Sequence, residues 1–253
     1  SPPRQNDDSE IKDKFYKYTA AELLDKSLSL ISNSMKYDAI VVDEGQDFHD
    51  VWWVVLEKLY QKSMGNQPLF IFFDPKQSLY LDQIALPPNI GKPYLLSENC
   101  RNTRKIASYC SNVLSVKISL KEDAPEGSSP LELQGSTWDD VIRLAKQQIQ
   151  DWCLRERGAL KPNQVAILML NEWRKWPSEF GNIRIVSDMD AWRNGKGVLL
   201  TTCRKFKGLE ADAIVIAGVP VPGMSRLYGK PDHYVASSRA KHLLKVIYYS
   251  SNW

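Results

Sequence analysis

The sequence predicts an α/β fold in which helices cover parallel sheets, divided into two units. Short continuous runs of apolar residues, typical of buried parallel strands, alternate with segments of helical periodicity. The first two apolar runs end at Asp43 and Asp74, and open sheets of this kind bind ligands at the carboxyl ends of their strands. With 253 residues, 43% of them hydrophobic, the chain can form a sizeable core.

The first unit is expected to begin after a polar, proline-containing tract, so residues 1–18 are interpreted as linker or disordered. A helix is predicted from Thr19, because Thr19 and Glu22 have the spacing of a capping box. A strand in YDAIVVDE, a helix in DVWWVVLEKLYQKS and a strand in PLFIFFD follow. We assign residues 19–93 to this unit.

The second unit is assigned to residues 94–253 and begins with a strand leading into a helix, in PYLLSENCRNTRKIASYCSNVL. The tract KEDAPEGSSP is predicted to be a loop, and TWDDVIRLAKQQIQDWCLRERG a helix with a threonine cap. Four strands are predicted, in QVAILML, NIRIVS, GVLLTT and AIVIAGV. HYVASSRAKHLLKVIYYS predicts a helix followed by a last strand.

Charge and cysteine usage narrow the function classes. The net charge of +3 is compatible with a nucleic-acid partner but does not require one. The four cysteines form no CxxC pair and do not cluster with the three histidines, which argues against a zinc site and a disulfide framework. We therefore expect free thiols in a reducing cytoplasm. No apolar run is long enough to span a bilayer, so no membrane partner is expected.

The adjacent acids Asp43 and Glu44 stand at the end of an apolar strand, a position that suits nucleotide hydrolysis. The aspartate can hold Mg²⁺ through water, because Mg²⁺ keeps much of its hydration shell, and the glutamate can accept a proton from the attacking water. The alternative is a pair of solvated acids that cap the next helix. The two residues alone favour this alternative.

Five motifs change that balance. VVDEGQDF resembles the Walker B motif, DExQD, of superfamily 1 helicases of the UvrD/Rep type. FFDPKQSLY, LLSENCRNTRKIA, VLLTTCRKFKGLEADAIVI and YVASSRAKHLL resemble motifs III to VI of the same family. The residues that carry these four matches are Asp74, Gln77, Ser78, Tyr80, Asn99, Arg101, Lys207, Gly208, Leu209, Glu210 and Arg239. The five motifs occur in the family's order across most of the chain.

The resemblance implies a P-loop NTPase fold with RecA-like sheets. Residues 19–93 would form a partial first RecA-like domain, and residues 94–253 a complete second one without a large 2B-type insertion. The implied cofactors are ATP and Mg²⁺. The implied partner is single-stranded or partly duplex DNA, along which the protein would move as it hydrolyses ATP.

The resemblance also implies roles in catalysis. Asp43 would serve Mg²⁺, Glu44 would position or deprotonate water, and Gln77 would sense the γ-phosphate. Arg101 and Arg239 would act as arginine fingers, since a guanidinium is always charged and matches phosphate oxygens in a fork. For Arg239 alone, a surface cation on a helix is the plainer interpretation.

Further residues are implied to bind the two ligands. Glu210 would bind the ribose hydroxyls, with Lys207 and Gly208 in the same cofactor-binding motif. Lys241 is expected to be a solvated neighbour. The residues implied to contact nucleic acid are Tyr80, Thr202, Arg204 and Lys205. A core tyrosine and two surface cations are the plainer alternatives for Tyr80, Arg204 and Lys205.

Three departures from the family pattern matter. The phosphate-binding loop GxxxxGK[ST] does not occur in the sequence, so no backbone cradle or lysine for the phosphates is supplied. Cys100 replaces an adenine-stacking tyrosine, and Asp82 replaces a base-stacking aromatic.

Two explanations of the missing loop remain. The chain is a fragment of a helicase whose upstream domains carry the loop, or a helicase-like module that binds nucleic acid or a partner protein without hydrolysis. A metal-dependent nuclease using Asp43, Glu44 and Asp74 is a third hypothesis, which gives Arg101 and Arg239 no role.

Overall fold

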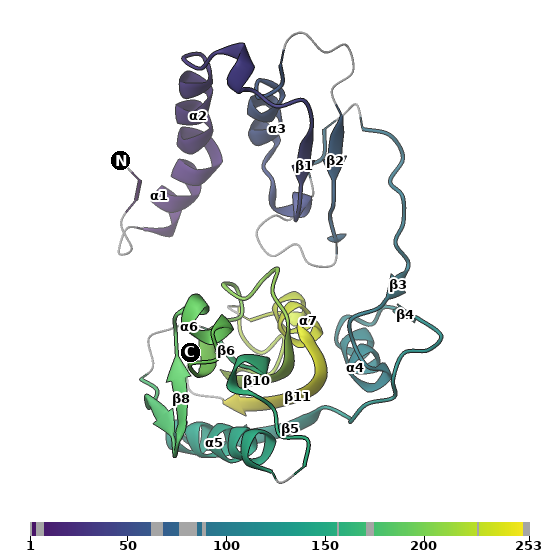
Figure 1. Ribbon diagram of the computed structural model, residues 1–253, viewed down its shortest axis with the longest axis vertical. Coiled ribbons are helices and arrows are strands. Elements are labelled where there is room, and N and C mark those ends of the chain that lie inside the picture. The colour runs from purple at the N-terminus through teal and green to yellow at the C-terminus, as the bar shows by residue number, and fades with distance from the viewer. Residues whose placement is uncertain are drawn as a thin grey trace. The chain divides into compact units, whose positions relative to one another are not determined.

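The computed structural model describes residues 2–3, 8–61, 68–75, 85–87, 90–155, 157–170, 175–226 and 228–249. The chain divides into two compact units, Ser1–Tyr94 and Leu95–Trp253 (Figure 1). The predicted α/β class with parallel sheets is confirmed. Gln77 and Tyr80, for which the sequence implies roles, lie outside the described residues.

Unit 1 places two parallel strands beside helices. Its elements are α1 (Ser9–Lys14), η1 (Phe15–Thr19), α2 (Ala20–Leu28), η2 (Asn33–Met35), β1 (Ile40–Val42), η3 (Gly45–Asp47), α3 (Asp50–Glu57) and β2 (Leu69–Ile71). β1 and β2 pair in parallel, with Ile40 opposite Leu69. The strands predicted at these two places are thereby confirmed.

The two strands of unit 1 bury one face and expose the other. Ile40 and Val42 join Trp53 and Tyr60 in a buried cluster, as alternate residues of a strand point to the same face. The side chains of the opposite face are largely exposed, and they are Val41 (65%), Phe70 (56%) and Phe72 (53%).

Residues 9–18 are helical, so the prediction of a linker was wrong there. Asp8 caps α1 by accepting from the backbone N–H of Glu10. The following turn, η1, is a π-helix, and the indole of Trp52 in α3 donates to the carbonyls of Tyr16 and Lys17 at 3.1 and 3.2 Å. This contact holds the stretch against α3.

The helix predicted to start at Thr19 is also corrected. Thr19 has a helical backbone conformation and its side chain makes no capping hydrogen bond, because the helical path already runs through it from α1. The capping-box spacing was therefore a coincidence of sequence.

Unit 2 is built on one large sheet. Its strands are β3 (Glu98–Asn99), β4 (Ser119–Leu120), β5 (Leu131–Gly135), β6 (Val165–Met169), β7 (Glu179–Phe180), β8 (Ile183–Val186), β9 (Val198–Thr202), β10 (Ala211–Val219) and β11 (Ala240–Tyr249). Its helices are α4 (Arg104–Leu114), α5 (Trp138–Leu154), η5 (Pro162–Gln164), α6 (Met189–Arg193) and α7 (Lys230–Ser238). Among the described residues, seven strands pair in the order β5-β11-β10-β6-β9-β8-β7, all in parallel except β7 with β8.

Helices cover both faces of this sheet. α5 packs through Val141, Ala145 and Ile149 on the face that contains Val215 and Ile247. Tyr248 follows Ile247 and so points to the opposite face, where α4 and α7 pack against each other and against β11. Parallel strands buried on both faces account for the continuous apolar runs of β6 and β10.

Within the described residues, no helix combines the length and the apolar character that a membrane crossing requires.

Candidate functional site

The two acids at the end of β1 lie in a tight, unusual turn. Asp43 is exposed, and its Oδ1 accepts from the backbone N–H of Glu44 at 2.8 Å. Glu44 itself adopts a left-handed backbone conformation, φ 53° and ψ 40°, which is uncommon for a residue with a side chain. Strained backbone of this kind clusters at functional sites and persists when the surroundings hold it.

Gln46 holds that turn in place. It is fully buried, and its Nε2 donates to Oε2 of Glu44 in a short hydrogen bond, while its Oε1 accepts from the backbone N–H of Asp74 at 3.0 Å. Its side chain therefore joins the segments that follow β1 and β2. The sequence placed Gln46 in the family motif but assigned it no role.

Gly45 allows the two segments to come this close. Its N–H donates to the carbonyl of Phe72 at 2.9 Å. A Cβ at this position would lie 2.5 Å from Cγ2 of Ile71, so a larger residue would push the segments apart.

The carboxylates suit a hard cation in part. Carboxylate oxygens are the ligands that Mg²⁺ prefers, and Asp43 presents one at the surface. However, the described residues contain no group of three or more acidic, histidine or cysteine side chains placed to hold a metal ion. The nuclease hypothesis, which needs Asp43, Glu44 and Asp74 together, is therefore not supported, whereas a largely hydrated Mg²⁺ on Asp43 is compatible with the geometry.

In unit 2, Glu210 gathers two cations at the amino-terminal edge of the sheet. It directly precedes β10, and its two oxygens accept from Nε of Arg101 and from Nζ of Lys241, both at 2.7 Å. The hydrogen bond from Lys241, followed by that from Arg101, lowers the pKa of this carboxyl. Lys241 was expected to be solvated, and that expectation was wrong, because Lys241 follows β11's first residue beside Glu210.

Two asparagines position Arg101. Oδ1 of Asn99 accepts from the backbone N–H of Arg101 at 2.9 Å and from that of Asn102 at 3.1 Å. The buried Asn102 then donates through Nδ2 to the carbonyls of Ser238 and Ala240, at 3.0 and 2.6 Å. The turn that carries Arg101 is thus fixed to the start of β11, and Asn102 is a positioning residue that the sequence did not single out.

Arg239 lies deeper than the sequence implied. It is 2% exposed at the end of α7, and its Nε donates to the carbonyl of Val235 at 3.2 Å. A plain surface cation is excluded by this burial. A role at the γ-phosphate stays a prediction, and it requires the guanidinium to exchange its present contacts for phosphate oxygens.

The residues implied to contact nucleic acid lie at the opposite, carboxyl-terminal edge of the sheet. Thr202 ends β9, and its Oγ1 accepts from the backbone N–H of Lys205 at 3.2 Å. Arg204 is exposed, with its Nη2 4.0 Å from Asp232 in α7. In the turn that follows, Gly208 has a φ of +80°, which favours glycine.

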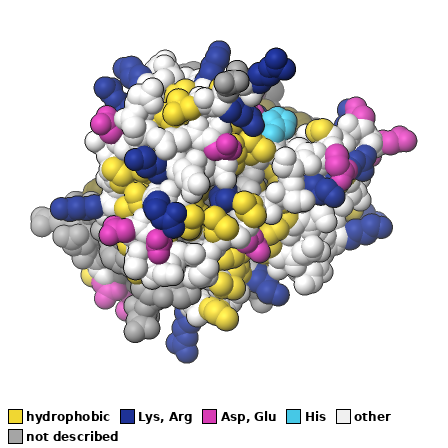
Figure 2. Space-filling model, turned by 90° about the horizontal axis from the view of Figure 1, so that it is seen from below, with side chains coloured by type: hydrophobic (Ala, Val, Ile, Leu, Met, Phe, Trp, Pro, Cys, Tyr) yellow, Lys and Arg dark blue, Asp and Glu magenta, His cyan; other side chains and the backbone are white. Residues whose placement is uncertain are grey.

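Charge on the surface is mixed. On the face drawn in Figure 2, Lys and Arg side chains are spread among Asp and Glu side chains and apolar ones. That face therefore presents single basic side chains and not one continuous basic patch.

Comparison with known proteins gives a local match. No protein-family model matches the sequence. The chain is 39% identical over 67 residues to one component of an ATP-dependent helicase/nuclease from Natranaerobius thermophilus. This match covers 26% of the chain but 5% of that protein. It supports a relationship to helicases, and it leaves the individual motifs and the activity of the whole protein to be proposed.

Proposed function

We propose that this chain belongs to the motor core of a superfamily 1 helicase or translocase of the UvrD/Rep type, which hydrolyses ATP to move along single-stranded DNA. The observation that best supports this proposal is the separation of residues in unit 2. Arg101, Glu210 and Lys241 gather at one edge of the sheet, and Thr202 and Arg204 lie at the other. Such an arrangement suits a domain that meets a nucleotide at one edge and a strand at the other.

The proposed chemistry is mainly positioning and charge compensation, as is usual in phosphoryl transfer. Mg²⁺ with ATP would supply the reacting phosphates and neutralise part of their charge. Asp43 would hold the hydrated ion, and Glu44, oriented by Gln46, would accept the proton of the attacking water. Arg101 would leave Glu210 for a phosphate oxygen, and Glu210 would be free to accept from ribose hydroxyls.

Hydrolysis is proposed to need a partner segment. The sequence contains no GxxxxGK[ST] loop, so the chain alone has no backbone cradle for the β- and γ-phosphates. We propose that upstream domains of the same protein supply this loop, and that the chain by itself is inactive as an ATPase.

The test joins the chain to a segment that carries a phosphate-binding loop. The joined protein should hydrolyse ATP in a manner stimulated by single-stranded DNA, while the chain alone should not. Glu44→Gln should lower the stimulated rate by at least about a hundredfold, since it removes the proposed general base. Glu57→Gln, an exposed change in the same unit, is the matched control. If Glu44→Gln leaves the rate unchanged, the role given to Glu44 is wrong.

A second candidate is a helicase-like module that binds nucleic acid or a partner protein without hydrolysis. The burial of Arg239 favours it, because a finger that stays inside unit 2 contributes nothing to phosphoryl transfer. In that case the joined protein would bind single-stranded DNA with an affinity that ATP does not change, and would show no stimulated hydrolysis.

A further inference from the structure

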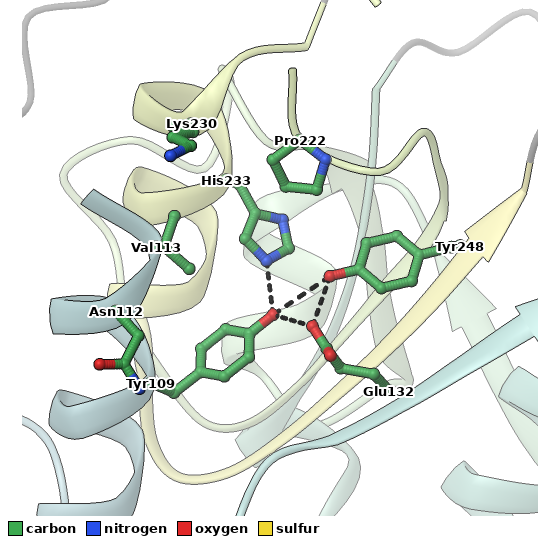
Figure 3. A pocket seen from close by; sticks show the side chains of 8 residues that line it. All are labelled: Tyr109, Asn112, Val113, Glu132, Pro222, Lys230, His233 and Tyr248. Atoms are coloured by element: carbon green, nitrogen blue, oxygen red, sulfur yellow. Dashed lines mark hydrogen bonds between the residues drawn. The ribbon is translucent and has the colours of Figure 1, made fainter. Parts of the chain in front are cut away.

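Unit 2 contains a pocket of about 390 Å³ that none of the family motifs accounts for. Its volume is in the range of small-ligand sites, roughly 300–1,000 Å³. Its polar lining comes from α4, β5, α7 and β11 and consists of Tyr109, Asn112, Glu132, Lys230, His233 and Tyr248 (Figure 3).

The hydrogen bonds of the pocket can be assigned proton by proton. Tyr109 and Tyr248 both donate to Oε1 of Glu132, the first at 2.6 Å. Because the one hydroxyl proton of Tyr109 is used there, Nε2 of His233 must donate to the oxygen of Tyr109, 2.6 Å away. Nδ1 of His233 then accepts from the hydroxyl of Tyr228 at 2.8 Å. His233 is therefore neutral and its ring is fixed from both sides.

Two charged groups remain available in the pocket. Both tyrosines use Oε1 of Glu132, and no described residue supplies a hydrogen bond to its Oε2. Lys230 begins α7, is exposed, and has no ion pair within the described part of the chain. The pocket thus offers one carboxylate oxygen that can accept a hydrogen bond and one ammonium group that can bind an anion.

These two groups are separated. In Figure 3, Lys230 and Glu132 lie at opposite ends of the pocket, with His233 and the ring of Tyr109 between them. A single ion would meet only one of them. An extended ligand with an anionic group at one end and a hydrogen-bond donor at the other would meet both.

The pocket also lies near the residues implied to contact nucleic acid. Asp232, in the same turn of α7 as Lys230 and His233, is the acid that faces Arg204 at 4.0 Å. A strand that passes Arg204 would therefore run toward the start of α7. This continuity favours a nucleotide over an unrelated small molecule as the occupant.

We propose that this pocket binds one nucleotide of a single strand and selects bases that carry an exocyclic amino group; the inference rests on the proposed function. The amino group of cytosine, adenine or guanine would donate to Oε2 of Glu132, while the phosphate meets Lys230. The half-buried tyrosine rings offer apolar surface to the base. Thymine presents O4 where cytosine presents its amino group, so it would place an acceptor against the carboxylate.

The test compares strands of deoxycytidine and of thymidine of equal length, about ten nucleotides, by fluorescence anisotropy with the chain. Cytidine strands should bind about tenfold more tightly, the size expected for one hydrogen bond to a charged group. Glu132→Gln keeps an acceptor for the tyrosines but turns a donor toward the base, so the preference should vanish or reverse. Glu179→Gln, an exposed change on β7 at the far end of the sheet, should leave it intact. Lys230→Ala should weaken both strands alike.

The outcomes separate the two proposals. Equal binding of both strands, unchanged by Glu132→Gln, overturns the pocket inference while the strand-binding function stands. Failure of both strands to bind overturns nucleic-acid binding by this chain. Nuclear magnetic resonance then decides the pocket itself. Deoxycytidine monophosphate should shift the ring signals of His233 and Tyr248 more than thymidine monophosphate does, and the absence of any shift overturns the inference outright.

Discussion

Glu44 illustrates how single residues prepare a site. Its left-handed backbone costs free energy, of the order of 1–3 kcal/mol for a residue with a side chain. The buried amide of Gln46 offsets this cost by bonding the carboxylate of Glu44 and the backbone of Asp74 at once. The carboxylate is therefore fixed before any ligand arrives, which reduces the reorganisation that catalysis would require.

His233 makes the stability of unit 2 depend on pH. Burial lowers the pKa of His233 to about 4, below the value near 6.5 of an unfolded histidine. The unfolded state therefore binds more protons between these values, so this contribution to stability is fully present above about pH 6.5 and is lost as the pH falls toward 4. Between pH 7 and pH 5, the free energy of unfolding should fall by about 2 kcal/mol more in the native protein than in His233→Gln.

Urea unfolding of both proteins at the two pH values measures this difference. The variant removes the titrating group, so it serves as its own reference for the other acids and bases. An identical pH dependence in both proteins would show that His233 already binds a proton in the folded state.

Gly218 is required by both its backbone and its neighbour. Its φ is +67°, and a Cβ there would lie 2.3 Å from Cζ3 of Trp138. Gly218→Ala should lower the free energy of unfolding by about 3 kcal/mol, from left-handed strain and displacement of the indole together. Gly195→Ala is the matched control, because Gly195 has a φ of +74° with no atom within 4 Å of the added Cβ. It should cost about 1 kcal/mol, and equal losses in the two variants would exclude the clash with Trp138.

At the scale of elements, the sequence was most informative where a local pattern suffices. The cap of α5 is an example, since Thr137 accepts from the backbone N–H of Asp140 at 3.1 Å as its spacing predicts. The buried strands β6 and β10 were recognised from continuous apolar runs. β5 was missed, because its alternating sequence Leu-Glu-Leu-Gln becomes a strand only by pairing with β11, more than a hundred residues later.

The cap of α5 can be tested directly. Thr137→Ala should lower the free energy of unfolding by about 1 kcal/mol, since the N–H of Asp140 loses its acceptor at a helix end. Thr137→Ser retains the hydroxyl and should stay within a few tenths of a kcal/mol of the native protein. Thermal or urea unfolding followed by circular dichroism gives both values, and equal stability of the two variants would contradict the cap.

The candidate site divides in the same way. The motifs located Asp43, Glu44, Arg101 and Glu210 in the chain, and a local reading could do no more than that. The pairing of Glu210 with Arg101 and Lys241, and the network around His233, join residues from distant elements. Such contacts depend on how the strands are ordered in the sheet, which a single sequence does not specify.

At the scale of the whole molecule, the two units differ in how much of their sheet is covered. The central strands of unit 2 are buried on both faces, and Val165, Ile167, Ile214 and Ile216 have no exposed area. The two described strands of unit 1 expose Val41, Phe70 and Phe72 on one face. Parallel sheets are normally covered on both faces, so unit 1 has the weaker support for its strands.

This difference predicts unequal hydrogen exchange. Amides of β6 and β10 should exchange only through global unfolding of unit 2, whereas amides of β1 and β2 should exchange through local opening at a much lower free energy. Mass spectrometry of peptides that cover these strands measures both rates in one experiment. Equal protection of the strands in the two units would show that unit 1 is as firmly held as unit 2.

The position of β11 has a consequence for synthesis. It is the last strand the structure describes in chain order, yet it lies inside the sheet, between β5 and β10. While the ribosome is still making residues 240–249, β5 has no neighbour and one edge of β10 is open. A nascent chain in this condition exposes unpaired strand edges, which favour aggregation. We therefore expect the sheet of unit 2 to close in one late step, once β11 is available, and not strand by strand as translation proceeds.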